Sequence, residues 1–142
     1  MLLIILATFL YAVLVTVSSM FLNSLSVPMF LTLLYIVPVC INLVLIKLQK
    51  SEKYKRIYSL LFPTLAMGAY VLFAYLTSNS GVWGEFVQLN TLANDDISVD
   101  IAEDLFSTTQ ILFAALVYYA SSITLHLLSK SNKKAKKGVT YA

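Results

Sequence analysis

The sequence is poor in charge, cysteine, histidine and glycine, and each shortage excludes a class of function. Charged residues make up 12% of the 142 residues and hydrophobic residues 59%, whereas about a quarter of an ordinary soluble domain is charged. A single cysteine, Cys40, excludes an intramolecular disulfide, a metal site built from several cysteines and a CxxC redox pair. With one histidine, His126, and no glycine-rich phosphate loop among four glycines, we predict no metal site and no cofactor.

A catalytic constellation is also missing. The seven acidic residues include no pair that a predicted rigid surface would hold opposite a base. Serine and threonine are plentiful, but His126 has no acid positioned beside it and lies four residues before Lys130, near the end of an apolar run. We therefore predict no catalytic residues and no enzymatic activity.

The few charges that are present are sorted by sign along the chain. Six of the seven acids lie between residues 77 and 107, and only Glu52 lies among basic residues. The basic residues form two clusters beside apolar runs, a pattern that indicates membrane topology and contact with anionic lipid rather than nucleic-acid binding. The ten predicted lipid contacts are Lys47, Lys50, Lys53, Lys55, Arg56, Lys130, Lys133, Lys134, Lys136 and Lys137.

Four apolar stretches have the length of about 20 residues that a membrane-spanning helix needs. They cover residues 2–22, 27–48, 57–77 and 107–128. Because cytoplasmic loops are rich in Lys and Arg, both termini are expected in the cytoplasm and the acidic loop 78–106 outside. The sequence therefore predicts an all-α, multi-pass protein of the cell (cytoplasmic) membrane, with a compact antiparallel four-helix bundle as its one domain, residues 1–129.

The ends of this bundle have their own patterns. The basic cytoplasmic tail, residues 130–142, is too short and polar to fold alone, and we expect it to contact anionic lipids of the inner leaflet. In the outer loop, the apolar residues from Val82 to Leu89 have helical spacing, which predicts an interfacial helix with Trp83 at headgroup level. Ile97, Ile101 and Leu105 predict a second helical stripe that extends the fourth span outward.

Polar groups within the spans are mainly tyrosines, which need hydrogen-bond partners at this depth. Pro38 in the second span leaves the carbonyl of Leu34 without its helical donor. Two interpretations are open: the phenols bond to neighbouring groups and pack the bundle, or they line a small polar cavity for a lipid-like or aromatic ligand. The candidate midplane polar cluster consists of Tyr11, Tyr35, Asn42, Tyr70, Tyr118 and Tyr119.

Small residues recur every three or four positions in three of the spans. Such residues let transmembrane helices approach closely, so we expect added bulk at Ala12 or Gly68 to separate helices of the bundle. The candidate helix-packing residues are Thr8, Ala12, Thr16, Thr64, Gly68, Ala114 and Ser121.

Function follows by elimination. A chain without a catalytic set or an intramembrane carboxylate, lysine or arginine offers mainly packing surfaces and two charged faces. We predict an accessory, regulatory or protective subunit that acts through contacts with lipid and with a larger membrane protein or a second copy. The alternative is a subunit of a small oligomeric channel or transporter. A membrane enzyme that uses a bound cofactor is a third possibility, for which no ligand set is visible.

Overall fold

The computed structural model describes the backbone of residues 2–94, 97–99 and 101–139, and the side chains of residues 2–91 and 101–128. The described chain is almost entirely helical, with one short two-stranded ribbon. Its elements are α1 (Leu2–Met20), the 3₁₀ turn η1 (Leu22–Ser24), α2 (Val27–Leu31), the π-helical turn η2 (Thr32–Ile36), α3 (Val37–Leu48), α4 (Glu52–Asn79), α5 (Val82–Asn90), β1 (Leu92–Asn94), β2 (Ile97–Val99) and α6 (Thr108–Val139).

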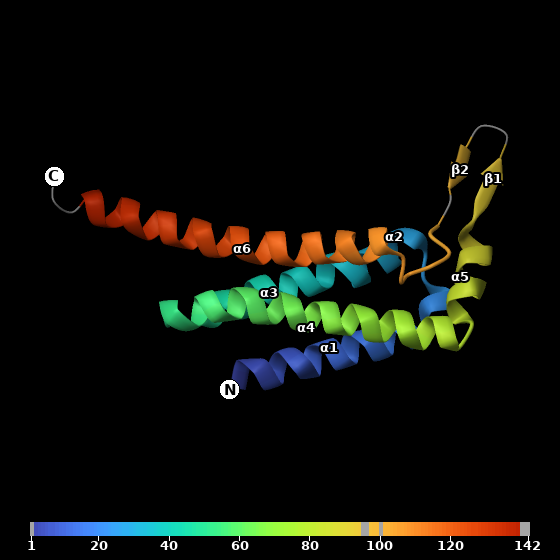
Figure 1. Ribbon diagram of the computed structural model, residues 1–142, viewed down its shortest axis with the longest axis horizontal. Coiled ribbons are helices and arrows are strands. Elements are labelled where there is room, and N and C mark those ends of the chain that lie inside the picture. Colours follow the sequence, from blue (N-terminus) through green and yellow to red (C-terminus); the bar gives the residue numbers. More distant parts are fainter. Residues whose placement is uncertain (1, 95–96, 100, 140–142) are drawn as a thin grey trace.

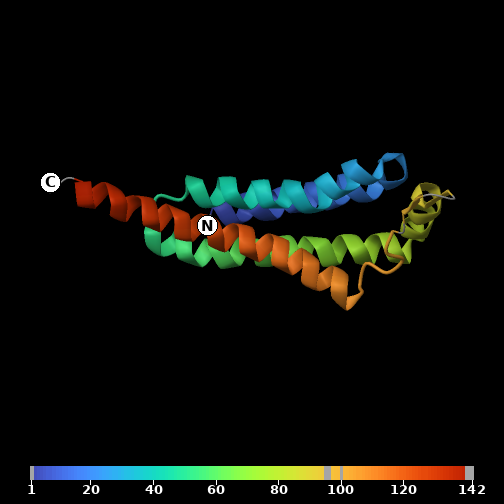
Figure 2. The same cartoon turned by 90° about the horizontal axis from the view of Figure 1, so that it is seen from above.

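Four helical segments are long and apolar enough to cross a membrane, which confirms the predicted helical, multi-pass character. They are Leu2–Met20, Val27–Leu48, Glu52–Asn79 and Thr108–Leu128, and their mean hydropathy lies between 1.7 and 2.5. They lie side by side, and successive segments run in opposite directions along the long axis (Figures 1 and 2). Helices α3 and α4 contact each other, and each of them contacts both α1 and α6. Helix α1 begins, and α6 ends, at the end of the molecule where α3 turns into α4 (Figure 1).

The second span is continuous but irregular, because Pro38 lies near its middle. Proline has no N–H to donate, so the carbonyl of Leu34, four residues earlier, loses its ordinary helical partner. Here the chain forms the π-helical turn η2 immediately before α3, a local widening that accommodates such a break. Thr32, in the same turn, donates from its hydroxyl to the carbonyl of Pro28 at 2.8 Å.

Helix α4 supplies the largest part of the interior. Its buried residues recur every three or four positions, the period of one helix face, whereas residues such as Leu60 and Tyr75 on its other side are exposed. Large apolar side chains also cover the outside of the other spans, and Leu116 on α6 is 66% exposed. This surface is typical of helices that face lipid. The buried face of α4 contains Tyr58, Phe62, Ala66, Tyr70, Phe73 and Thr77.

The outer loop agrees with the sequence in its first half. Helix α5 forms where apolar spacing predicted it, from Val82 to Asn90. Trp83 is only 4% exposed, and its ring packs against both Phe30 and Phe86 at centroid distances of 5.4 Å. Its indole N–H donates to the carbonyl of Glu103 at 3.0 Å. The side chain therefore joins the second span, α5 and the connection before α6, and its position at headgroup level stays a prediction.

The predicted helix over Ile97, Ile101 and Leu105 is wrong. Residues Ile97–Val99 form β2, which pairs antiparallel with β1, and α6 begins only at Thr108, so the fourth span has no outward helical extension. Alternating β-branched residues in this segment favour a strand over a helix. Leu105 belongs to the irregular connection that follows and is buried against the bundle.

The basic tail begins as a continuation of the fourth span, because α6 runs without a break to Val139. Lysine and alanine are good helix formers, and the preceding span has already met the cost of nucleating the helix. The tail is thus an extension of the fourth span, although its side chains lie outside the described residues.

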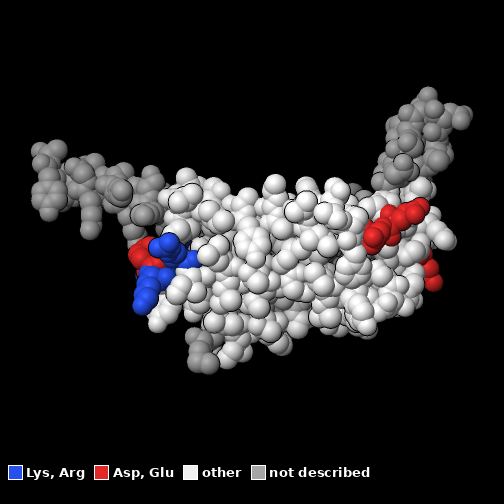
Figure 3. Space-filling model, viewed as in Figure 1, with Lys and Arg blue, Asp and Glu red and all other residues white. Residues whose placement is uncertain are grey.

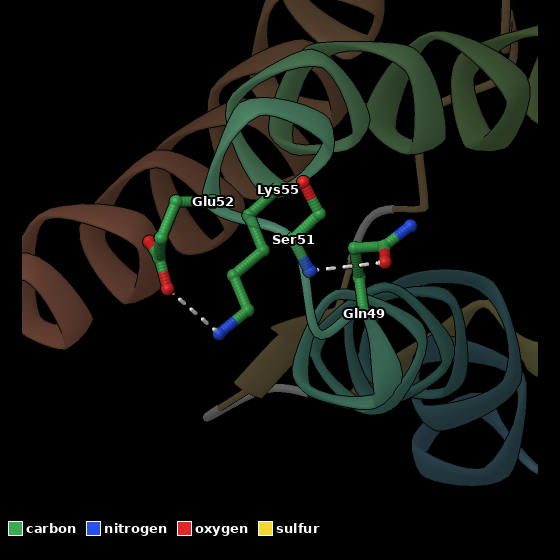
Figure 4. A network of polar contacts seen from close by, with 4 residues as sticks. All are labelled: Gln49, Ser51, Glu52 and Lys55. Atoms are coloured by element: carbon green, nitrogen blue, oxygen red, sulfur yellow. Dashed lines mark hydrogen bonds and ion pairs between the residues drawn. The ribbon is translucent and has the colours of Figure 1, made fainter.

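Charge is divided between the two ends of the molecule. On the face in view, Figure 3 shows Lys and Arg side chains beside acidic atoms at the end where α3 turns into α4, and acidic side chains at the opposite end. At the basic end, Lys55 Nζ lies 3.3 Å from Glu52 Oε1, and the Ser51 N–H donates to Gln49 Oε1 at 3.2 Å (Figure 4). An exposed pair of this kind contributes little stability, so the main property of this end is its positive charge.

Candidate functional site

Two of the predicted midplane tyrosines bond to the irregular part of the second span. The Tyr118 hydroxyl donates to the carbonyl of Leu34 at 2.5 Å, which is the carbonyl that Pro38 deprives of its helical donor. The Tyr11 hydroxyl donates to Asn42 Oδ1 at 2.5 Å and lies 3.4 Å from the carbonyl of Pro38. These bonds connect α1 and α6 to the same span. Tyr118 therefore supplies the donor that the proline removes, and Tyr11 joins α1 to the helix that follows the proline.

Two other tyrosines bond to groups at the acidic end of the bundle. The Tyr70 hydroxyl donates to the carbonyl of Leu105 at 2.9 Å, and the Tyr35 hydroxyl donates to Gln110 Oε1 at 3.2 Å. Leu105 precedes α6 and Gln110 lies in its first turn, so these phenols bond to groups outside the middle of the span. Their ring centroids are 6.5 Å apart.

Tyr119 stands apart from the other members of the predicted cluster. Its hydroxyl shares a 2.7 Å hydrogen bond with the Thr64 hydroxyl, which joins α6 to an exposed part of α4. The six predicted cluster residues thus divide among three places: the region around Pro38, the acidic end of the bundle, and the α4–α6 seam. Each of the five phenols has a hydrogen-bond partner within the chain.

The interior leaves little free volume between these groups. One cavity of about 10 Å³, comparable with the space needed for a single water, lies between α1, the second span, α4 and α6. Ser18, Tyr70 and Tyr118 are among its lining residues. Among the described residues, Ser18 Oγ, Asn42 Nδ2 and Ser122 Oγ are buried atoms without a hydrogen-bond partner. The interior of one chain is therefore a packed core with a few unsatisfied polar atoms.

The small residues of α1 and α4 line an open groove. This α1–α4 groove has a volume of about 250 Å³. A Cβ built on Gly68 meets no atom within 4 Å, and Ala12 and Thr16 are likewise exposed. The expectation that bulk at Ala12 or Gly68 would separate helices of the chain's own bundle therefore changes, because both residues are exposed and, among the described residues, a Cβ on Gly68 would meet no atom within 4 Å. The groove is lined by Thr8, Tyr11, Ala12, Val15, Thr64, Leu65, Gly68, Ala69 and Leu72.

Threonine hydroxyls along α1 and α4 are already satisfied by their own helices. Thr8, Thr16 and Thr64 each donate to the carbonyl four residues earlier, at 2.8–3.0 Å. Because these bonds satisfy the hydroxyl groups, the threonines present mainly their methyl groups, which are small and apolar. Of the two small residues predicted on α6, Ala114 is fully buried, whereas Ser121 is half-buried and donates to the carbonyl of Tyr118 at 3.1 Å.

A second hollow lies at the acidic end and was not predicted from the sequence. This outer cavity has a volume of about 290 Å³ between the second span, α5, the connection before α6 and the first turn of α6. Gln110, an amide at the start of an apolar span, is a sequence signal for a polar site at this end. The sequence does not indicate which residues Gln110 contacts. The cavity is lined by Val27, Phe30, Leu31, Tyr35, Trp83, Ile101, Ala102, Leu105 and Gln110.

The predicted lipid-contacting residues are described in part. The cluster from Lys47 to Arg56 surrounds the turn between α3 and α4, beyond the apolar part of both helices. The side chains from Lys130 to Lys137 lie outside the described residues. Among the residues that the structure describes, no three His, Cys, Asp or Glu side chains come together in a way that could hold a metal ion.

Comparison of the chain with known protein families, with curated proteins and with solved structures gave no match. Arguments about its function therefore rest on the geometry of the interior, the α1–α4 groove and the outer cavity.

Proposed function

We propose that the chain is a multi-pass protein of the cell membrane whose four long helices form an antiparallel bundle across the bilayer, with both termini in the cytoplasm. The distribution of charge supports this orientation, because the turn between α3 and α4 carries five basic residues and one acid, and the opposite end carries only acids. The basic residues would then contact anionic lipids of the inner leaflet, each contributing about 1 kcal/mol near the surface.

Within this frame we propose a non-enzymatic accessory or regulatory subunit whose α1–α4 groove receives one transmembrane helix of a larger membrane protein. The observation that carries the proposal is the open face of Gly68, together with Ala12 on the facing helix. Small residues at a lipid-facing position contribute little to packing within the chain. Opposite another helix, they allow close backbone approach and extended van der Waals contact.

A helix fits this groove better than a flexible lipid chain. The groove runs between two helices of 19 and 28 residues, both of which reach the length of a membrane span. Its wall offers two ridges of small residues, which is the geometry of close helix pairs in membranes. Because the threonine hydroxyls are satisfied within their own helices, an apolar partner helix needs no matching polar group.

The alternative, a subunit of an oligomeric channel or transporter, would place a second copy of the chain in the same groove. A cavity of about 10 Å³ between the spans gives no support to a pore through a single copy. The identity of the groove's occupant therefore discriminates between the two functions.

Affinity purification in a mild detergent tests the proposed function. Tagged wild-type protein from its own host cell is expected to carry one membrane protein in a fixed ratio, and Gly68→Leu is expected to lose it. Leu116→Phe, which adds bulk to an exposed position on α6, serves as the matched control and should retain the partner. Loss of the partner from both variants, or from neither, would contradict docking in the groove.

Cysteine labelling tests the proposed orientation separately. In a Cys40→Ala background, a cysteine at Ser51 should be protected from an impermeant reagent in intact cells, and a cysteine at Asn94 should react. The opposite pattern would show that the orientation is inverted.

A further inference from the structure

The outer cavity is built from four segments that are far apart in the sequence. Phe30 and Tyr35 come from the second span, Trp83 from α5, Ala102 from the connection before α6 and Gln110 from α6. Its volume of about 290 Å³ is close to the lower limit of small-molecule sites, which are about 300–1,000 Å³. The cavity therefore suits one alkyl chain or a small apolar body, and is too small for a two-chain lipid.

The connection before α6 covers this cavity and is fixed at two points. Trp83 donates to the carbonyl of Glu103 at 3.0 Å, and Tyr70 donates to the carbonyl of Leu105 at 2.9 Å. The intervening Asp104 accepts a hydrogen bond from the Phe106 N–H at 2.8 Å, which orders the turn that follows. The cavity wall is thus held by side chains of α4 and α5 instead of being a loose loop.

The charged residues of the connection that lines the cavity are all acidic. Glu103 and Asp104 are exposed on the connection and adjoin the lining residues Ala102 and Leu105 in the sequence. No Lys or Arg occurs between residues 57 and 129 of the sequence. An apolar cavity whose wall-forming connection carries exposed carboxylates complements a molecule with an apolar tail and a positive head, and it disfavours an anionic amphiphile.

We propose that the outer cavity binds a single-chain amphiphile with a cationic head group, with its tail against Phe30, Trp83 and Leu105 and its head near Glu103 and Asp104. At the polar side of the cavity, the Tyr35–Gln110 hydrogen bond offers an amide that can bond to a polar group near the head. This site is separate from the α1–α4 groove and does not depend on what the groove binds.

Trp83 provides a direct reporter, because it is the chain's only tryptophan and lines the cavity. Purified protein in phosphatidylcholine nanodiscs would be titrated with undecyl trimethylammonium carrying a terminal bromine, which quenches indole fluorescence only at close range. Brominated undecyl sulfate has the same tail and the opposite charge. Saturable quenching is expected with the cation. The anion is expected to bind with an affinity at least about threefold lower than that of the cation, a difference in the range of exposed charge interactions.

Two substitutions separate the cavity from the surrounding lipid. Ala102→Phe fills the cavity without adding a tryptophan and is expected to weaken binding about tenfold or more, as overfilled apolar sites do. Glu103→Gln should weaken binding of the cation about threefold, whereas Glu52→Gln at the opposite end should leave it unchanged.

Quenching of equal strength in wild type and Ala102→Phe would show only bulk membrane partitioning and would overturn the proposal. So would equal affinity for the cationic and anionic probes in the unaltered protein, a comparison that needs no variant to fold. If Ala102→Phe is not stable, Val27→Phe fills the cavity from the opposite wall and is held to the same criterion.

Discussion

Ala66 and Gly68 are two residues apart on α4, yet they face different surroundings. Ala66 is 1% exposed and lies in the interior, where α4 packs against the other spans. Gly68 faces the α1–α4 groove, where a Cβ would meet nothing within 4 Å. Both are small residues in the same apolar helix. A small residue in a membrane helix therefore predicts that another helix can approach closely. It does not predict whether that helix belongs to the same chain.

The interior and the groove also differ in how their polar groups are satisfied. In the interior, phenols cross between helices, as Tyr11 does to Asn42 and Tyr118 to the carbonyl of Leu34. Along α1, the exposed threonines Thr8 and Thr16 bond within their own helix, and Thr64 on α4 bonds both to its own helix and to Tyr119 of α6. The cross-helix bonds determine which helices meet in the interior, whereas binding of a helix in the groove would depend mainly on shape.

The largest expected effect comes from adding the same side chain at these two positions. Ala66→Leu should destabilise the protein by about 1–3 kcal/mol, because extra methyl groups overpack a filled interior. Gly68→Leu should be neutral, or stabilising by up to about 1 kcal/mol, because it replaces a poor helix former at an open position. Thermal unfolding of both purified variants in the same detergent measures the difference. An equal loss of stability would mean that the groove is closed against the chain's own helices.

A smaller effect is expected from the hydrogen bonds of the interior. Tyr118→Phe leaves the carbonyl of Leu34 without its donor beside the π-helical turn, and should cost about 0.6 kcal/mol and at most about 1.7, as intramembrane hydrogen bonds do. Tyr75→Phe removes a hydroxyl from an exposed position of α4 and is the matched control, with no change expected. Unfolding of both variants checks this. A cost for Tyr118→Phe no larger than that of the control would show that the bond contributes nothing measurable.

Residue type and periodicity predicted the parts of this fold that depend on local chemistry. The apolar stretches predicted the four long helices, and the spacing from Val82 to Leu89 predicted α5. Pro38 indicated that the carbonyl of Leu34 would need another donor. The identity of that donor, Tyr118, depends on how α6 packs against the second span, 84 residues apart in the sequence, which no local pattern encodes.

The errors have the same origin. The stripe of Ile97, Ile101 and Leu105 has helical spacing, but the carbonyl of Leu105 accepts a hydrogen bond from Tyr70 of the bundle, and Ile97 belongs to a strand that pairs with β1. The packing of Trp83 against Phe30 likewise depends on a segment that is distant in the sequence, and no local pattern indicates it. The outer cavity could not be predicted either, because it exists only where four distant segments meet.

Photo-crosslinking from within the groove tests most directly whether it holds a partner helix. Benzoylphenylalanine would replace Leu72, a bulky and half-exposed groove residue, or Leu116 on the exposed face of α6 as the control. After illumination of intact cells, position 72 should give one discrete protein adduct and position 116 none. An adduct with twice the mass of the chain would identify a second copy and favour the oligomeric alternative. A heavier adduct would identify a larger partner protein. No adduct from position 72, or the same adducts from both positions, would contradict the proposal that the groove receives a helix.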